Sequence, residues 1–168
     1  MEIPYYHVDS FSHVLFAGNP AGVCILPCPL TGRVLHQIAA ENALSQTAFV
    51  TPQANGDFDL RWFTPKVEDD LCGHATLASA FVLSLRGHIA WPIRFHTRSG
   101  VLTVAREGDR YVMDFPAWLA EPCEPPAELL PALGIDAAQV MKARDYLVVV
   151  DQASAYVRSP PTFARWAD

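Results

Sequence analysis

Residues 70–87 read DLCGHATLASAFVLSLRG. Between Ala75 and Leu85 only threonine and serine interrupt the apolar side chains, so a helix formed there would have no strongly polar face. A helix that is apolar nearly all round is typical of a position buried on every side. Gly87 is the residue type that most often ends helices. We therefore predict a buried helix over Ala75–Leu85, at the centre of its domain.

Segments with the character of β-strands flank this helix in the sequence. A second helix, with one apolar face, is expected over Gly32–Asn42, capped by Thr31. The fold class is therefore α+β, with a curved mixed sheet or barrel wrapped around the central buried helix. The predicted strands, rich in Val, Phe and Tyr, are Ile3–Phe11, Ala21–Leu26, Gln46–Thr51, Phe58–Phe63, Ile93–Thr97, Val101–Ala105 and Tyr111–Phe115.

The composition changes after Phe115, where PAWLAEPCEPPAELLP contains five prolines, a pattern typical of an exposed connector. A short helix near Ala127–Leu133, a strand over Tyr146–Val150 and the start of a helix at Phe163–Trp166 are expected after it. We divide the chain into a first lobe, residues 1–115, and residues 116–168. The second part is a connector and an incomplete second lobe, because it has too few residues to bury a core of its own.

The overall composition excludes several classes of protein. Of the 168 residues 51% are hydrophobic and 18% charged, which is typical of a folded globular chain. The net charge is −6 without a basic run, so no nucleic-acid partner is expected. The longest apolar run is too short to cross a membrane, and the N-terminus does not resemble a signal peptide. The four cysteines (Cys24, Cys28, Cys72 and Cys123) lack disulfide-scaffold and zinc spacing. We expect a reduced, cytoplasmic protein with no metal.

Gly73 and His74 stand where the buried helix begins. The first amides of a helix have no partner within it and carry partial positive charge. Gly73 would let a ligand approach these amides closely, which makes a carboxylate site. His74 could transfer a proton near neutral pH. The alternative is that Gly73 interrupts a strand and His74 only caps the helix.

Two neighbouring features are compatible with the same chemistry. Cys72 adjoins these amides, which can lower a thiol pKa and so make a thiolate base available. The alternative is a buried cysteine that acts as a small apolar residue. The polar segment ENALSQT, residues 41–47, could line a cleft or could supply ordinary caps and turns.

Several motifs occur together in the order and spacing of a known family. On these motifs the chain resembles the phenazine-biosynthesis (PhzF-like) isomerases, which share the fold of diaminopimelate epimerase. The resemblance is strong up to Phe115 and looser beyond it. The motifs are VDSF (Val8–Phe11), GNPAGVC (Gly18–Cys24), IAAENALSQTAFV (Ile38–Val50), LRWFTP (Leu60–Pro65), DLCGHATLASA (Asp70–Ala80) and TRSGVLTV (Thr97–Val104).

The resemblance implies two similar lobes, each a curved sheet enclosing a helix, with the substrate between the two helix N-termini. The implied reaction is proton transfer at carbon without metal, flavin or pyridoxal, and therefore without a cofactor. The partner would be a small carboxylate-bearing metabolite; the best-known member isomerises a dihydro-hydroxyanthranilate. We also expect a homodimer, because the part after Phe115 leaves apolar groups such as Leu147, Val148 and Val149 without cover.

The resemblance also suggests roles for individual residues. The family usually has a glutamate acid/base where this chain has Gln46, and its second-lobe motif is not reached before Asp168. An amide cannot cycle a proton, so we expect binding of a family-type acid with slow or no turnover. The alternatives are a cysteine-based racemase or epimerase using Cys72, and a non-catalytic binding protein that keeps the fold. The candidate catalytic residues are Gln46, His74 and Cys72, and the candidate substrate-binding residues are Asn19, Ser45, Asp70 and Gly73.

Overall fold

The computed structural model describes residues 2–87, 89–115, 117–136 and 138–151. The chain divides into two compact units, Met1–Phe115 and Pro116–Asp168, and each is considered by itself.

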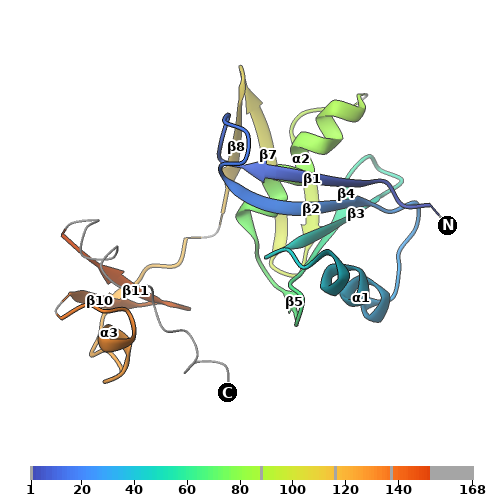
Figure 1. The fold of residues 1–168 in the computed structure, drawn as a ribbon. Helices are drawn as coiled ribbons and strands as arrows, with labels where there is room; N and C mark the ends of the chain where they lie inside the picture. The colour runs from blue at the N-terminus through green and yellow to red at the C-terminus, as the bar shows by residue number, and fades with distance from the viewer. Residues whose placement is uncertain (1, 88, 116, 137, 152–168) are drawn as a thin grey trace. The chain divides into compact units, whose positions relative to one another are not determined.

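The first unit is an eight-stranded sheet that curves around the helix α2 (Figure 1). The strand order is β1-β2-β3-β4-β6-β7-β8, with β5 paired to β4. The pairs β2–β3 and β4–β6 are parallel and the others antiparallel, so the sheet is mixed, as predicted. The elements are β1 (Tyr5–Ser10), β2 (Asn19–Ile25), α1 (Gly32–Asn42), β3 (Thr47–Pro52), β4 (Phe58–Phe63), β5 (Glu68–Asp69), α2 (Gly73–Arg86), β6 (Ile93–Thr97), β7 (Gly100–Glu107) and β8 (Arg110–Asp114).

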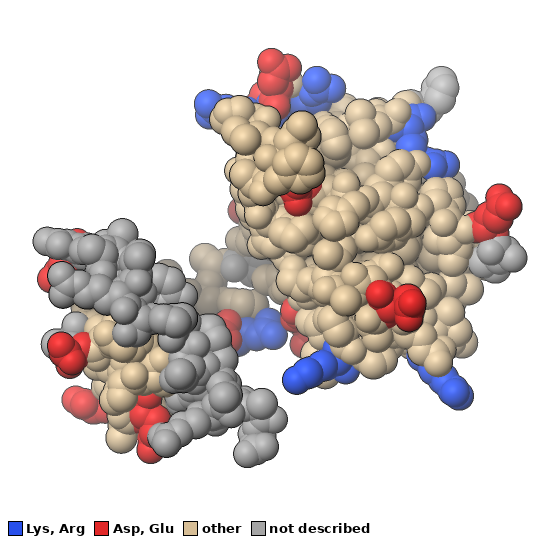
Figure 2. All heavy atoms as spheres, viewed as in Figure 1, with Lys and Arg blue, Asp and Glu red and all other residues tan. Residues whose placement is uncertain are grey.

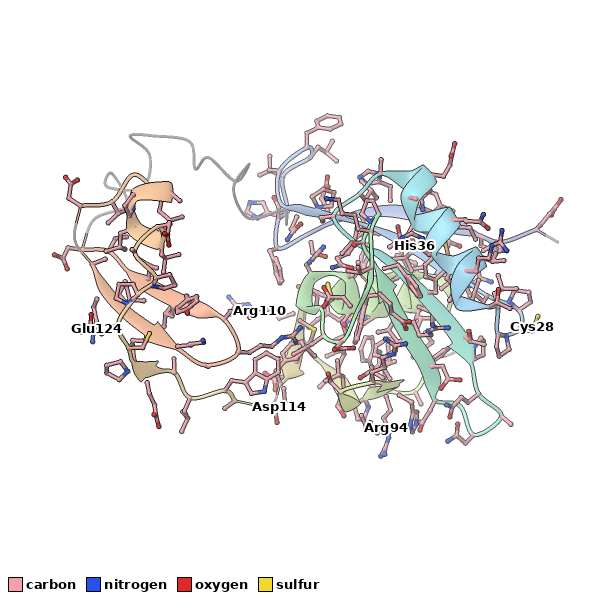
Figure 3. All side chains as sticks on the ribbon, turned by 90° about the horizontal axis from the view of Figure 1, so that it is seen from below. Cys28, His36, Arg94, Arg110, Asp114 and Glu124 are labelled. Atoms are coloured by element: carbon pink, nitrogen blue, oxygen red, sulfur yellow. The ribbon has the colours of Figure 1, made fainter. Side chains whose placement is uncertain are left out.

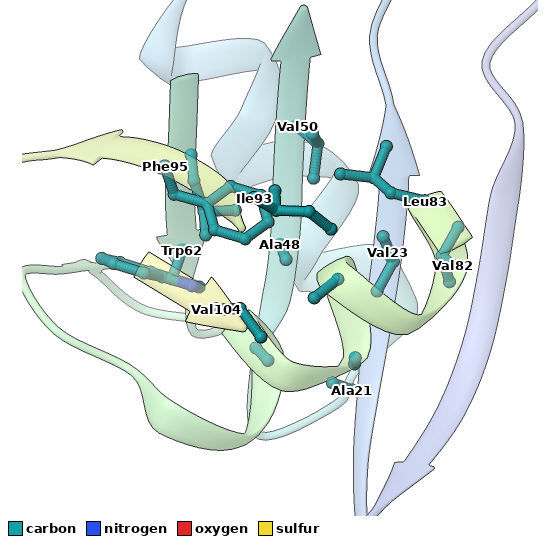
Figure 4. Close-up of a cluster of buried hydrophobic side chains, with 14 of the residues drawn as sticks. Ala21, Val23, Ala48, Val50, Trp62, Val82, Leu83, Ile93, Phe95 and Val104 are labelled. Carbon is teal, nitrogen blue, oxygen red and sulfur yellow. The ribbon is translucent and has the colours of Figure 1, made fainter. Parts of the chain in front are cut away.

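The core of this unit lies between α2 and the inner face of the sheet (Figure 4). Ala75, Ala78, Ala80 and Val82 of α2 are at most 1% exposed, and they share one cluster with inward-facing side chains such as Trp62. Small side chains on the helix let its backbone approach the strands closely. The predicted α+β fold, with a sheet around a central helix, is confirmed.

The outer face of the sheet carries α1. Alternate residues of a strand point to opposite faces, so Ala48 and Val50 enter the α2 core while Phe49 points outward. There Phe49 packs with Leu35 and Ala39 of α1. The apolar face predicted for this helix is thereby covered.

Two details of the helices differ from expectation. The helix α2 is not buried on every side, because Phe81 is 38% and Leu85 66% exposed. Together with half-buried Leu77 these residues are four apart, and they form one stripe that the sheet covers only in part, through the contact of Phe81 with Tyr111 of β8. Thr31 occupies the N-cap position of α1, but its hydroxyl makes no capping hydrogen bond.

Gly87 follows the last turn of α2 with a φ of 75°, which confirms the predicted stop.

The described part of the second unit is a small antiparallel sheet with one short helix. Its strand order is β11-β10-β9. The structure adds β9, β10 and, in the first unit, β5, which the sequence did not predict; the two-residue strands β5 and β9 are too short to show alternation. The predicted Phe163–Trp166 helix lies outside the described residues. The elements are β9 (Glu121–Pro122), α3 (Leu129–Ala132), β10 (Gln139–Lys142) and β11 (Tyr146–Val149).

No helix within the described ranges combines the length and the apolar character needed to cross a membrane. Figure 2 shows one face of the first unit as largely uncharged, with lysine and arginine side chains spread around its rim. On this face they do not form the continuous basic surface that phosphate backbones require.

Leu83 and Leu85 offer a matched test of the packing around α2. Leu83 is 4% exposed within the core, whereas Leu85 is 66% exposed on the same helix. Leu83→Ala should lower the free energy of unfolding by about 2–5 kcal/mol, because it removes buried surface and leaves a cavity. Leu85→Ala should change it by no more than about 0.5 kcal/mol. Urea titration followed by circular dichroism measures both values, and equal losses would contradict this packing.

Candidate functional site

The helix α2 begins at Gly73, so the amides of Gly73 and His74 belong to its first turn. The N-cap residue is Cys72, and no side chain caps the helix by a hydrogen bond. A Cβ atom added to Gly73 would meet only the ring of Phe115, at an ordinary contact distance of 3.7 Å. Packing within this unit therefore does not demand glycine here, and the missing side chain leaves space beside the amides.

His74 is held close to this helix start. Its Nδ1 lies 3.4 Å from the Cys72 sulfur, and its carbonyl accepts a hydrogen bond of 2.7 Å from the Ser10 hydroxyl. Its Nε2 is buried and has no hydrogen-bond partner among the described residues. Burial lowers the pKa of His74, partly opposed by the backbone carbonyl of Pro20. The imidazole is therefore neutral at neutral pH, and Nε2 can donate or accept a hydrogen bond according to its tautomer.

Cys72 does not have the low pKa expected of a thiol at a helix N-terminus. Burial raises the pKa of Cys72 to about 11, and the charge of Asp69 adds to this effect. The backbone amides of Ala75 and His74 lower it, but by less. Of the two alternatives for Cys72, the structure supports the buried cysteine, because its side chain is only 7% exposed and burial outweighs the helix amides. The thiol is protonated at neutral pH.

Gln46 stands directly before β3 and is 7% exposed. Its Nε2 donates a hydrogen bond of 2.8 Å to Oδ2 of Asp69, while its Oε1 is buried and has no hydrogen-bond partner among the described residues. Asp69 pairs across β5 and β4 with Trp62, so both side chains stand on the inner face of the sheet. The contacts run from Gln46 to Asp69, whose charge acts on Cys72, and from Cys72 to His74.

Buried polar atoms without partners concentrate in this region. The described residues contain four such side-chain atoms: Gln46 Oε1, Trp62 Nε1, His74 Nε2 and, on α1, His36 Nε2. Leaving a buried donor or acceptor unsatisfied costs about 1–3 kcal/mol, so native proteins seldom do it without a ligand or water in place. His74 Nε2 belongs to the uncapped first turn of α2, Gln46 hydrogen-bonds to Asp69, and Trp62 pairs with Asp69 across β4 and β5, so we take the start of α2 as the candidate site.

The remaining predicted residues lie at the edge of this group or outside it. Exposed Asn19 pairs with Ser10, the residue that holds the His74 carbonyl. The Ser45 hydroxyl donates to the Pro20 carbonyl at 3.4 Å. The Asp70 carboxylate is exposed and lies 3.7 Å from the Arg98 guanidinium, so the structure does not bring it to Gln46 and His74.

Sequence reasoning missed Asp69, Ser10 and Trp62. Asp69 could not be distinguished from its neighbour Asp70, because inward and outward residues of a two-residue strand cannot be read from a pattern. Ser10 stands in the VDSF motif and Trp62 in LRWFTP, so both lay in segments already singled out.

The described residues contain no group of three or more His, Cys, Asp or Glu side chains arranged to hold a metal ion. Cys24 is buried, whereas Cys28 projects from the surface after β2 (Figure 3), so these two do not face a common site.

Comparison with known proteins identifies the family of this chain. An isomerase of Pseudomonas aeruginosa, named as uncharacterised, is 54% identical over 98% of this chain and 64% of its own length. A similarly named isomerase of Halalkalibacterium halodurans is 42% identical over 98% of this chain and 63% of its length. The crystal structure of a PhzF-family phenazine biosynthesis protein from Enterococcus faecalis superposes with a TM-score of 0.86 at 39% identity, over 98% of this chain and 63% of that one.

The chain thus spans slightly less than two thirds of the length of these relatives. Residues 8–153 match the family described as phenazine biosynthesis-like protein, PhzC-PhzF. The predicted resemblance is confirmed: the chain belongs to the phenazine biosynthesis-like (PhzC-PhzF) family.

Proposed function

We propose that this protein is a cofactor-independent isomerase that moves a proton between carbon atoms of a small carboxylate-bearing metabolite. The observation that carries the proposal is the set of unsatisfied polar atoms around the uncapped start of α2. Membership of a family with members named isomerases supports the same reaction class. The chain spans 63–64% of the length of the relatives it matches, so the activity of the whole protein is part of the proposal.

The proposed roles follow from the geometry. The substrate carboxylate binds the amides of Gly73 and His74, which carry the positive end of the helix dipole. The His74 Nε2 hydrogen-bonds or protonates the substrate, because it is buried without a partner among the described residues. Gln46 presents its Oε1 as an acceptor. Ser45 and Asn19 lie at the rim, where they contact an extended substrate.

The alternative enzyme is a racemase or epimerase that uses Cys72 as its base. The 3.4 Å contact between its sulfur and His74 Nδ1 favours this chemistry, since the imidazole could accept the thiol proton. The pKa of about 11 opposes it. The third possibility is a binding protein that keeps the fold without the chemistry.

We also propose that the protein works in the cytoplasm. Cys24, Cys28, Cys72 and Cys123 are all free, as suits a reducing cytoplasm.

Anion binding at the helix start can be tested with anthranilate as the probe. Gly73→Ala should weaken its binding at least tenfold, measured by calorimetry, because the added methyl group fills the space beside the amides. The melting temperature should stay within a few degrees, since the new Cβ makes only an ordinary contact with Phe115. Unchanged affinity would place the anion elsewhere, and structural proof would come from the ligand position in a crystal.

Deuterium exchange from solvent into dihydro-hydroxyanthranilate separates the three functions. His74→Ala should lower the exchange rate by about 10²–10⁴-fold, the range typical of a lost acid/base group, and Cys72→Ala should lower it far less. A thiolate mechanism predicts the reverse, with a rate that climbs as the pH approaches the Cys72 pKa of about 11. Absence of exchange in the natural protein and in both variants would favour the binding protein.

We also propose that the protein is a homodimer. The strand β11 lies at one end of its sheet, and its Tyr146, Leu147 and Val149 side chains are 39–50% exposed. Apolar groups exposed beside a strand edge favour association. Sedimentation velocity should detect dimers or larger species at micromolar concentration, and a single monomer peak at high concentration would contradict the proposal.

A further inference from the structure

We propose that Asp69 is the proton-carrying residue of this site, in place of the neighbouring Gln46. The inference rests on the proposed function and adds to it a catalytic residue. It also changes the expectation of slow turnover that Gln46 alone suggests, because a carboxylate is present one hydrogen bond away.

The geometry of the pair supports this assignment. Gln46 Nε2 donates to Asp69 Oδ2 at 2.8 Å. An ionised carboxylate can only accept hydrogen bonds, so the amide must turn its nitrogen toward Asp69 and its oxygen away. That orientation agrees with the buried Oε1, which has no partner among the described residues and is left for a substrate donor. The pair thus contains one titratable acid and one fixed polar group.

Asp69 is also on the correct face of the sheet. Its cross-strand partner Trp62 belongs to the α2 core. Glu68, the preceding residue, points to the opposite face, where Arg61 and Arg98 hold its carboxylate at 2.7 and 2.6 Å. The two acids of β5 therefore have different surroundings. Glu68 forms ion pairs on the outer face, and the Asp69 carboxylate stands on the inner face.

The other titratable groups near Asp69 are less suited to carry the proton. On the α2 side stand Cys72, which is protonated at neutral pH, and His74, whose protonated form burial disfavours. Asp70 is directed to Arg98 on the exterior. Gln46 faces Asp69 from the start of β3 and does not titrate.

The proposed step is balanced without an added reagent. The Asp69 carboxylate removes a proton from a substrate carbon: the C–H bond breaks, an O–H bond forms, and the electron pair enters the conjugated system of the substrate. The resulting carboxylic acid then delivers the same proton to another carbon, and Asp69 returns to its ionised form. Gln46 Nε2 stabilises the ionised form before and after the transfer.

The chain contains a matched control pair. Gln53 Nε2 donates to Asp59 Oδ1 at 2.6 Å, joining the same residue types within the same sheet but away from the start of α2. Asp59→Asn therefore reproduces the chemical change of Asp69→Asn at a place where no proton transfer is proposed.

The experiment measures solvent deuterium exchange into dihydro-hydroxyanthranilate for the natural chain, Asp69→Asn, Asp59→Asn and the double variant Gln46→Glu/Asp69→Asn. Asp69→Asn should lower the rate by about 10²–10⁴-fold, and Asp59→Asn should leave it unchanged. The double variant returns one carboxylate to the pair and should recover most of the rate. Thermal unfolding of each variant checks that the fold is retained.

A second readout does not depend on activity. The side-chain amide resonances of Gln46 in ¹⁵N NMR spectra should shift with pH as Asp69 ionises, and this step should vanish in Asp69→Asn but persist in Asp59→Asn. A Gln46 amide that shows no step would overturn the pairing and with it the inference.

The outcomes distinguish the inference from the proposed function. If the natural chain exchanges deuterium and Asp69→Asn does so equally fast, Asp69 is not the carrier while the isomerase proposal stands. If neither the natural chain nor the double variant exchanges deuterium, the isomerase proposal fails and the inference fails with it.

Discussion

A helix with almost no polar side chains is stable in water only when other elements cover it, and the first unit is organised around that requirement for α2. The sheet bends around the helix, and the inward residues of its strands meet alanine and valine side chains. The sheet can cover the sides of α2 but cannot satisfy the amides at its first turn. The candidate site therefore lies where the covering ends, at Gly73.

The same constraint decides how the surrounding polar groups are arranged. Gln46, Trp62 and Asp69 stand on the inner face of the sheet because strand alternation and register place them there. Gln46 and Trp62 are buried there, and the described residues leave Gln46 Oε1 and Trp62 Nε1 without a hydrogen-bond partner. The stable core and the polar groups that lack hydrogen-bond partners at its end thus arise from one packing arrangement.

Much of this architecture could be predicted from the sequence. Residues 75–85 are so uniformly apolar that they predict a central helix. The pair Gly73 and His74 marks where that helix begins. Prediction failed where three-dimensional surroundings override local chemistry. The helix amides suggested a low pKa for Cys72, but the depth of its burial cannot be read from neighbouring residues. The exposure of Phe81 and Leu85 depends on where the sheet stops, which no helical pattern records.

The proposed transfer of the acid role from position 46 to Asp69 would let the site change its chemistry while keeping its shape. An acid and its amide are nearly identical in size, so negative charge could pass from one strand to the next during evolution in two substitutions. The route through two acids keeps a titratable group throughout, since carboxyl groups in contact share a proton. The route through two amides passes through a protein that has no titratable group at these two positions. Selection for activity would thus favour gaining the new acid before losing the old one, and relatives that carry both acids would mark the path.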